Sequence, residues 1–122
     1  MPEICRICLL LIRDLIFETR IRSTTESLGV TLMIAHGLAE FSSSLTDDPP
    51  CLVIVDLDST GDDGVEAVRQ AAACSFQPEI VAFGSHVAVH RAQAARDAGA
   101  TRVLARSRFT VELPTILQSI VS

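Results

Sequence analysis

Lysine is absent from the 122-residue sequence, and all ten basic side chains are arginine. A function that depends on a lysine therefore cannot operate here unchanged. Positive charge is also in the minority, because the formal net charge is −5. An acidic domain does not attract nucleic acid or an anionic membrane non-specifically, so we expect neither as a partner. Long hydrophobic runs are missing as well. The run near the N-terminus, residues 7–12, lies between Arg6 and Arg13 and is far shorter than the ~20 residues of a membrane-spanning helix.

Several common site motifs are lacking too. No Gly-x-Gly-x-x-Gly follows the first apolar run, which argues against a dinucleotide site. No Gly-x-Ser-x-Gly marks a hydrolase nucleophile, and Ser85 and His86 are neighbours in one turn. Cys5 and Cys8 would point to opposite faces of a strand, and no second pair completes a zinc site. We expect reduced, buried thiols, which fit a cytoplasmic location.

What the sequence does contain is a regular alternation of short apolar runs and longer helical patterns. Hydrophobic residues make up 48% of the chain, enough for one domain spanning residues 1–122. The predicted strands are residues 4–12, 30–35, 51–55, 79–83 and 101–105. The predicted helices are residues 15–28, 37–45, 64–74, 87–98 and 110–120, the last with Pro114 in its first turn. Five βα units in a row predict a parallel sheet with helices on both faces.

The residues just after each strand are the informative ones, because ligands of open parallel sheets bind beyond the carboxyl ends of the strands. These residues are Arg13 and Asp14, Asp56, Gly84 and Ser85, and Arg106. After Asp56 we expect a loop rich in Gly and Asp. Asp14 is expected to cap the following helix, which Gly29 ends.

One segment resembles a known pattern. Residues 52–64 are similar to the response-regulator receiver motif, in which a buried strand ends in the phospho-accepting Asp. The matching positions are Asp56, Leu57, Gly61, Asp63 and Gly64, whereas Ser59 and Thr60 replace a Met-Pro pair. Residues 98–100, Ala-Gly-Ala, also look like the receiver turn into the fifth strand. The resemblance implies a flavodoxin-like α/β fold, with a doubly wound five-stranded parallel sheet in the order 2-1-3-4-5 and five helices.

The resemblance also implies roles for individual residues. Asp56 stands at the phospho-acceptor position, and Asp14 matches the second acid of the pair after the first strand. If Mg²⁺ is bound, Asp14, Asp56 and the backbone carbonyl of Asp58 would hold it. Ser85 is a neighbour of the hydroxyl position, on which Phe83 or Gly84 falls. Arg106 occupies the place of the lysine that contacts phosphate.

Arg13 replaces the first acid of that pair, which changes the local charge by two units. Unit charges ~4 Å apart interact by about 4 kcal/mol at an effective dielectric constant of 20, so Mg²⁺ binding would weaken. The side chain either turns outward, or turns inward to pair with Asp56 in place of the metal. We therefore expect an atypical receiver, or pseudo-receiver, of a two-component phosphorelay. Phosphorylation at Asp56 would be weak or absent, and Mg²⁺ doubtful.

Two alternatives remain open. One is a conventional Mg²⁺-dependent receiver, and the other is a flavodoxin-like domain that binds a small molecule in a concave pocket at the strand ends. The resemblance implies a signalling domain and not an enzyme, with a sensor histidine kinase or an output protein as partner. A homodimer would use the face of the fourth helix, fifth strand and fifth helix, which carries Arg91, Arg102 and Arg108. The chain either acts alone or belongs to a longer protein.

Overall fold

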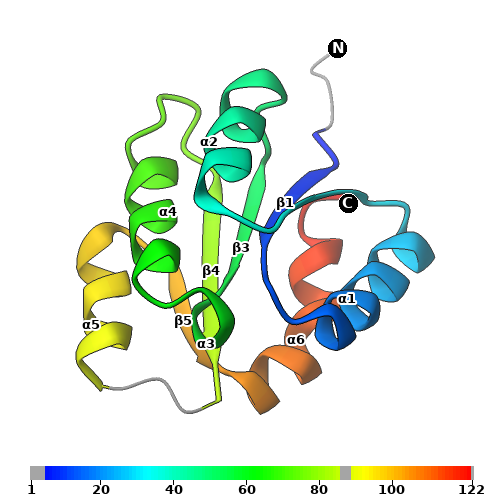
Figure 1. The fold of residues 1–122 in the computed structure, drawn as a ribbon. Helices are drawn as coiled ribbons and strands as arrows, with labels where there is room; N and C mark the ends of the chain where they lie inside the picture. The colour runs from blue at the N-terminus through cyan, green and yellow to red at the C-terminus, as the bar shows by residue number, and fades with distance from the viewer. Residues whose placement is uncertain (1–4, 86–88, 122) are drawn as a thin grey trace.

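The computed structural model describes residues 5–85 and 89–121 and contains one parallel sheet. The strands are β1 (Ile7–Leu11), β2 (Thr31–Ala35), β3 (Leu52–Asp56), β4 (Glu79–Gly84) and β5 (Arg102–Ala105). Their order is β2-β1-β3-β4-β5, and each neighbouring pair is parallel, as the resemblance implied (Figure 1). The predicted starts at Ile4 and Val87 lie outside the described residues.

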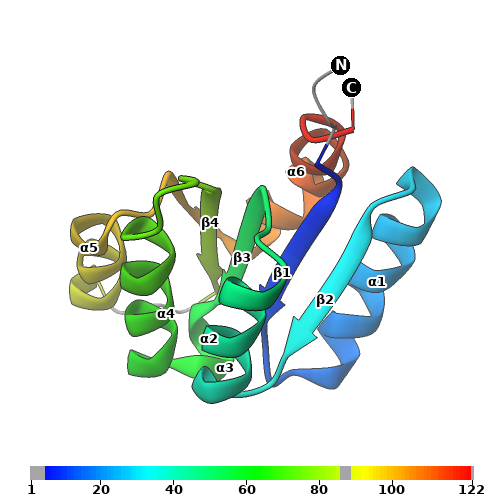
Figure 2. The same ribbon diagram turned by 90° about the horizontal axis from the view of Figure 1, so that it is seen from above.

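The helices cover both faces of the sheet. They are α1 (Leu15–Leu28), α2 (Leu38–Asp47), α3 (Leu57–Thr60), α4 (Asp62–Ala72), α5 (Val89–Ala98) and α6 (Arg106–Gln118). Helices α1 and α6 pack together on one face, whereas α2, α4 and α5 cover the other (Figure 2). The described part of the chain thus has six helices, not the five that the resemblance implied, because a short helix follows β3.

That short helix α3 lies where we expected a loop. Asp56 is its N-cap, and its Oδ1 atom accepts a hydrogen bond from the backbone N–H of Asp58. Thr60 donates its hydroxyl to the carbonyl oxygen of Asp56, which closes the turn. The prediction of a loop rich in Gly and Asp was wrong, because Asp56 caps a helical turn here and Thr60 closes it.

Helix α6 differs from its predicted bounds. It begins at Arg106, so Pro114 lies inside the helix and not in its first turn. Proline is disfavoured inside a helix because it lacks the N–H group for one helical hydrogen bond. The early turns are retained because Phe109 is fully buried and stacks on Phe83, with ring centroids 4.1 Å apart. Packing of an aromatic side chain outweighs local propensity here.

The core consists of two apolar clusters, one on each face of the sheet. Along β1, Leu9 and Leu11 face the α2–α4–α5 layer, whereas Cys8 and Leu10 face α1 and α6. Strand β3 is buried at every position, including its last residue, Asp56. Cys8 is buried, but Cys5 is exposed, which corrects its expected burial; the described cysteines are free thiols. Among the described residues, no helix is long and apolar enough to cross a membrane.

Candidate functional site

Asp56 ends the central strand β3 at the carboxyl edge of the sheet, and its side chain is fully buried. Both carboxylate oxygens accept hydrogen bonds: Oδ1 from the backbone N–H of Asp58 at 3.0 Å, and Oδ2 from the hydroxyl of Ser59 at 2.8 Å. Burial raises the pKa of Asp56 above its ordinary value, although these two donors act in the opposite direction. The carboxylate is therefore held in place by its own short helix.

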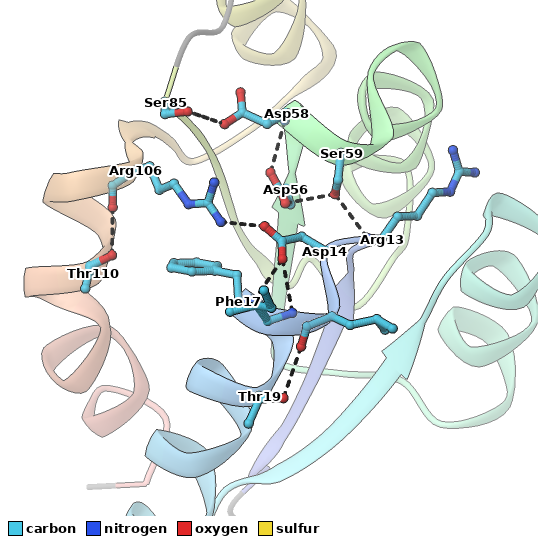
Figure 3. Close-up of polar contacts among 12 residues, drawn as sticks. Arg13, Asp14, Phe17, Thr19, Asp56, Asp58, Ser59, Ser85, Arg106 and Thr110 are labelled. Atoms are coloured by element: carbon cyan, nitrogen blue, oxygen red, sulfur yellow. Dashed lines mark hydrogen bonds and ion pairs between the residues drawn. The ribbon is translucent and has the colours of Figure 1, made fainter.

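Asp14 follows β1 and has two roles at once. Its Oδ1 atom caps α1 by accepting from the backbone N–H groups of Ile16 and Phe17, both at 3.1 Å. Its Oδ2 atom accepts from Nη2 of Arg106 at 2.7 Å (Figure 3). The hydrogen bond from Arg106, followed by that from the Phe17 N–H, lowers the pKa of Asp14. Asp14 is thus expected to be ionised and already paired at neutral pH.

Arg106 reaches Asp14 from the start of α6, 92 positions away in sequence. Its guanidinium carbon lies 4.2 Å from the centroid of the Phe17 ring, a cation–π contact. The side chains of Arg106 and Asp14 are 29% and 32% exposed, so the ion pair is only partly screened by water. Asp14 and Phe17 both belong to the first turn of α1, so Arg106 joins the beginnings of α1 and α6.

Arg13 adopts the outward orientation of the two considered. Its Nε donates to the carbonyl oxygen of His36 at 2.8 Å, and its Nη2 donates to Asp63 at 3.1 Å. The guanidinium points away from Asp56, whereas the backbone N–H of Arg13 donates to the Ser59 hydroxyl oxygen at 3.0 Å (Figure 3). Arg13 therefore does not replace a metal ion at Asp56. Compared with the receiver pattern that the sequence resembles, position 13 carries no acid.

Ser85 and Asp58 form a second pair at the same edge. Both the backbone N–H and the hydroxyl of Ser85 donate to Oδ2 of Asp58, at 2.6 and 2.7 Å. The Ser85 hydroxyl is thus directed to Asp58 and not to Asp56. The neighbouring acidic residues are also paired with arginines, Asp62 with Arg91 at 3.6 Å and Asp63 with Arg13.

This arrangement does not fit the predicted divalent cation site. Mg²⁺ needs oxygen ligands, usually one or two carboxylates with waters, at short and regular distances. Here a guanidinium and a helix N-terminus hold the Asp14 carboxylate, and both Asp56 oxygens accept hydrogen bonds from α3. Among the described residues, no group of three or more His, Cys, Asp or Glu side chains is placed to hold a metal ion. In this arrangement the carboxylates of Asp14 and Asp56 accept hydrogen bonds from the protein itself.

The sequence interpretation missed three contributors. Ser59 bridges Asp56 and the Arg13 backbone, and its spacing of three residues after Asp56 was the available signal. Phe17 contacts Arg106 through its ring. No signal in the sequence pointed to this role, because a Phe on an amphipathic helix is usually a core residue. His36 has a half-exposed side chain, holds Arg13 through its carbonyl oxygen and places its Nε2 2.7 Å from Oε1 of the buried Glu18.

Glu18 lies beneath this edge and is 8% exposed. Burial acts to raise its pKa, but hydrogen bonds from His36 and Arg22 outweigh burial, so the pKa is lowered. The ionised carboxylate links α1 to the segment after β2. It thereby fixes the backbone that accepts from Arg13.

Comparison with known proteins bears on the fold. No protein-family model matches the sequence, and no curated protein sequence matches it. Solved structures do match. A receiver domain from Bermanella marisrubri has a TM-score of 0.81 at 20% identity, covering 97% of this chain and 99% of that one. A response regulator from Thermotoga maritima has a TM-score of 0.78 at 15% identity, covering 96% and 98%.

A third structure is a response regulator from Burkholderia pseudomallei with a phosphorylated aspartic acid, a calcium ion and citrate. Its TM-score is 0.76 at 18% identity, covering 95% of this chain and 71% of that one. At these identities the likeness concerns the fold. The chain has the CheY-like, flavodoxin-like fold of response-regulator receiver domains. Within that fold, Asp56 ends the third strand, and the polar residues of the carboxyl edge surround it.

Proposed function

We propose that this chain is a receiver-like signalling domain of a two-component system that acts by contacting partner proteins, with weak or no phosphorylation at Asp56. The observation that carries the proposal is the ion pair between Arg106 and Asp14. The single acid that remains after β1 is occupied by an internal cation. A domain of this kind has no catalytic activity of its own and depends on its surfaces.

The electrostatics of the edge support this proposal. A divalent ion at Asp14 would have to displace Arg106 or lie close to it. At ~4 Å and an effective dielectric constant of 20, each unit of charge on the ion would be repelled by about 4 kcal/mol. Asp56 would also lose its hydrogen bonds to Ser59 and to the Asp58 backbone as its oxygens turned to the ion. Both effects disfavour Mg²⁺ relative to the arrangement observed.

The conventional alternative makes a different prediction. If Asp14, Asp56 and the Asp58 carbonyl bound Mg²⁺ despite Arg106, the affinity would be measurable and Asp56→Asn would lower it. The Burkholderia pseudomallei structure contains a phosphorylated aspartic acid and a calcium ion, so the fold itself is compatible with that chemistry. What argues against that chemistry in this chain is the arginine at position 13 and the pairing of Arg106 with Asp14.

For the partner we propose a sensor histidine kinase or an output protein. Nucleic acid and membranes remain unexpected, because the net charge is −5. The face of α5, β5 and α6 is the candidate for a homodimer. Its three arginines already have partners within the chain: Arg91 with Asp62, and both Arg102 and Arg108 with Glu112. Sedimentation velocity at several protein concentrations would detect a dimer.

The test of phosphorylation is incubation with Mg²⁺ and either acetyl phosphate or beryllofluoride, followed by intact mass and NMR. We expect no stoichiometric modification of the wild-type protein. The double variant R13D/R106K restores an acid pair and a lysine, and we expect it to gain Mg²⁺-dependent NMR shifts near Asp56. The triple variant that adds D56N is the matched control and should lose the gain. Stoichiometric modification of wild-type Asp56 would contradict the proposal.

A further inference from the structure

A cavity of about 460 Å³ opens between the beginnings of α1 and α6, beside the ion pair of Arg106 and Asp14. Its volume falls in the range of roughly 300–1,000 Å³ that is usual for small-molecule sites. Helix α1 contributes Ile16, Phe17 and Arg20 to its wall. The other side is formed by Ser85 after β4 and by residues 105–107 and 110 at the start of α6. Asp56 does not line this cavity, and neither do Asp58 and Ser59, whose groups donate to the Asp56 carboxylate.

The charge of the cavity is opposite to that of the protein. The chain carries a net charge of −5, yet the described lining residues include two arginines and no carboxylate. Arg20 is exposed and takes part in none of the ion pairs found among the described residues. Arg106 gives Nη2 to Asp14, which leaves further N–H donors of its planar guanidinium for a second anion.

The start of α6 adds to this preference. Its N-cap is Ala105, which has no side-chain acceptor for the first N–H groups of the helix. Unpaired N–H groups and the helix dipole attract negative charge at such an end. Ser107 and Thr110 lie at the same wall, and the Thr110 hydroxyl donates to the carbonyl oxygen of Arg106. The dipole only assists, because the two guanidinium groups supply the full charges.

The remaining wall is apolar. Ile16 is 83% exposed and lines the cavity together with the exposed Ala105, whereas Phe17 is 6% exposed and adds little apolar surface. A purely inorganic anion would leave this surface in contact with water, whereas an organic body would cover it. We infer that the cavity binds a small organic anion, whose carboxylate or phosphate group lies between Arg20 and Arg106 and whose apolar body rests on Ile16 and Ala105.

This site does not depend on phosphorylation at Asp56, but it shares Arg106 with Asp14. The two anions compete for one guanidinium group, so removing the charge of Asp14 should strengthen ligand binding. Asn caps a helix about as well as Asp, so the variant Asp14→Asn preserves the start of α1. Ligand binding should therefore become stronger when the ion pair between Arg106 and Asp14 is removed. If Arg106 had only a structural role, removing the charge of Asp14 would not strengthen binding.

The experiment is an NMR titration of the ¹⁵N-labelled protein with phenyl phosphate, benzoate and the neutral benzyl alcohol. We expect saturable shifts of the Ser107 and Arg108 amides with one or both anions, in the low-millimolar range typical of a probe with about ten non-hydrogen atoms. Whichever anion binds more tightly identifies the preferred head group. Benzyl alcohol should bind at least about tenfold more weakly, because it lacks the charge-assisted hydrogen bonds.

Three variants sharpen the test. Arg20→Gln should weaken binding about tenfold, since one charge-assisted hydrogen bond is worth about that much. Asp14→Asn should strengthen it. Arg69→Gln is the matched control, because Arg69 pairs with Glu66 on α4, on the other face of the sheet, and should leave binding unchanged. The inference is overturned if no amide at the start of α6 saturates, if benzyl alcohol binds equally well, or if Arg20→Gln and Arg69→Gln have the same effect.

Discussion

The ion pair between Arg106 and Asp14 should contribute measurably to stability, and a double-mutant cycle can isolate it. The single variants are Arg106→Gln and Asp14→Asn, and the cycle is completed by the double variant. Asn retains the helix-capping acceptor of Asp14, so this variant removes the charge and leaves the start of α1 intact. The two residues are 92 positions apart, so their coupling reports tertiary structure and not local helix formation.

The magnitude follows from the geometry. A hydrogen bond to a charged group contributes roughly 1.5–3 kcal/mol, whereas a fully exposed ion pair contributes about 0.2–1 kcal/mol. The two side chains are 29% and 32% exposed and 2.7 Å apart, which places the pair between these cases. We expect a coupling energy of about 1–1.5 kcal/mol. A loss of that size would lower the Tm by roughly 4 °C per kcal/mol in a domain of this length.

Urea denaturation of the four proteins, at pH 7 and again in acid, measures the coupling. The pKa of Asp14 is lowered in the folded state, so its stabilising contribution is present above the ordinary Asp pKa. It disappears as the pH falls through the lowered folded-state value. The coupling should therefore be largest at neutral pH and vanish in strong acid. If the free-energy changes of the two single variants add up to that of the double variant within about 0.5 kcal/mol at pH 7, the residues do not interact. The argument against Mg²⁺ would then lose its basis.

Two further predictions concern the buried residues of the same edge. Asp56→Asn should raise the Tm at pH 7, because burial raises the pKa of Asp56 and so penalises its ionised form. The gain in Tm should shrink as the pH falls toward the ordinary Asp pKa. A lower Tm of the variant at pH 7 would contradict this prediction. Phe109→Ala should cost about 3–5 kcal/mol in urea denaturation, because Phe109 is fully buried and stacks on Phe83, whereas the exposed Val111→Ala on the same helix should change stability by less than about 0.5 kcal/mol.

The parallel α/β architecture could be predicted from the sequence because its signals are repeated, whereas the strand order came from the resemblance to receiver domains. Each strand is a short apolar run, and each is followed by a helical pattern with a recognisable start or end, such as Asp14 and Gly29 around α1. Since parallel strands carry their carboxyl ends to one edge, the positions of Asp14, Asp56 and Arg106 followed from the strand ends alone. The errors lie where local signals are weak, at α3 and at the first turns of α6, which depend on capping by Asp56 and packing of Phe109.

The contacts at that edge could not be predicted in the same way. The outward orientation of Arg13 depends on two acceptors, the His36 carbonyl and Asp63, that come from distant segments. The pairing of Asp14 with Arg106 depends on the Phe17 ring, which holds the guanidinium over the first turn of α1. Sequence patterns give the neighbourhood of a side chain, but competition among several acceptors decides its direction.

The two arginines of the edge are best understood as one linked change. Arg13 lies outward and is paired with Asp63, and it stands where the receiver pattern that the sequence resembles has its first acid. The single carboxylate of Asp14 balances one positive charge, and Arg106 supplies that charge. A lysine would supply the same charge, but its ammonium group is not planar and would hold Asp14 in a less fixed geometry. Restoring only the acid at position 13 would leave Arg106 on Asp14, and restoring only the lysine at position 106 would leave too few oxygen ligands. The gain of Mg²⁺ binding should therefore require R13D and R106K together, with each single variant close to wild type.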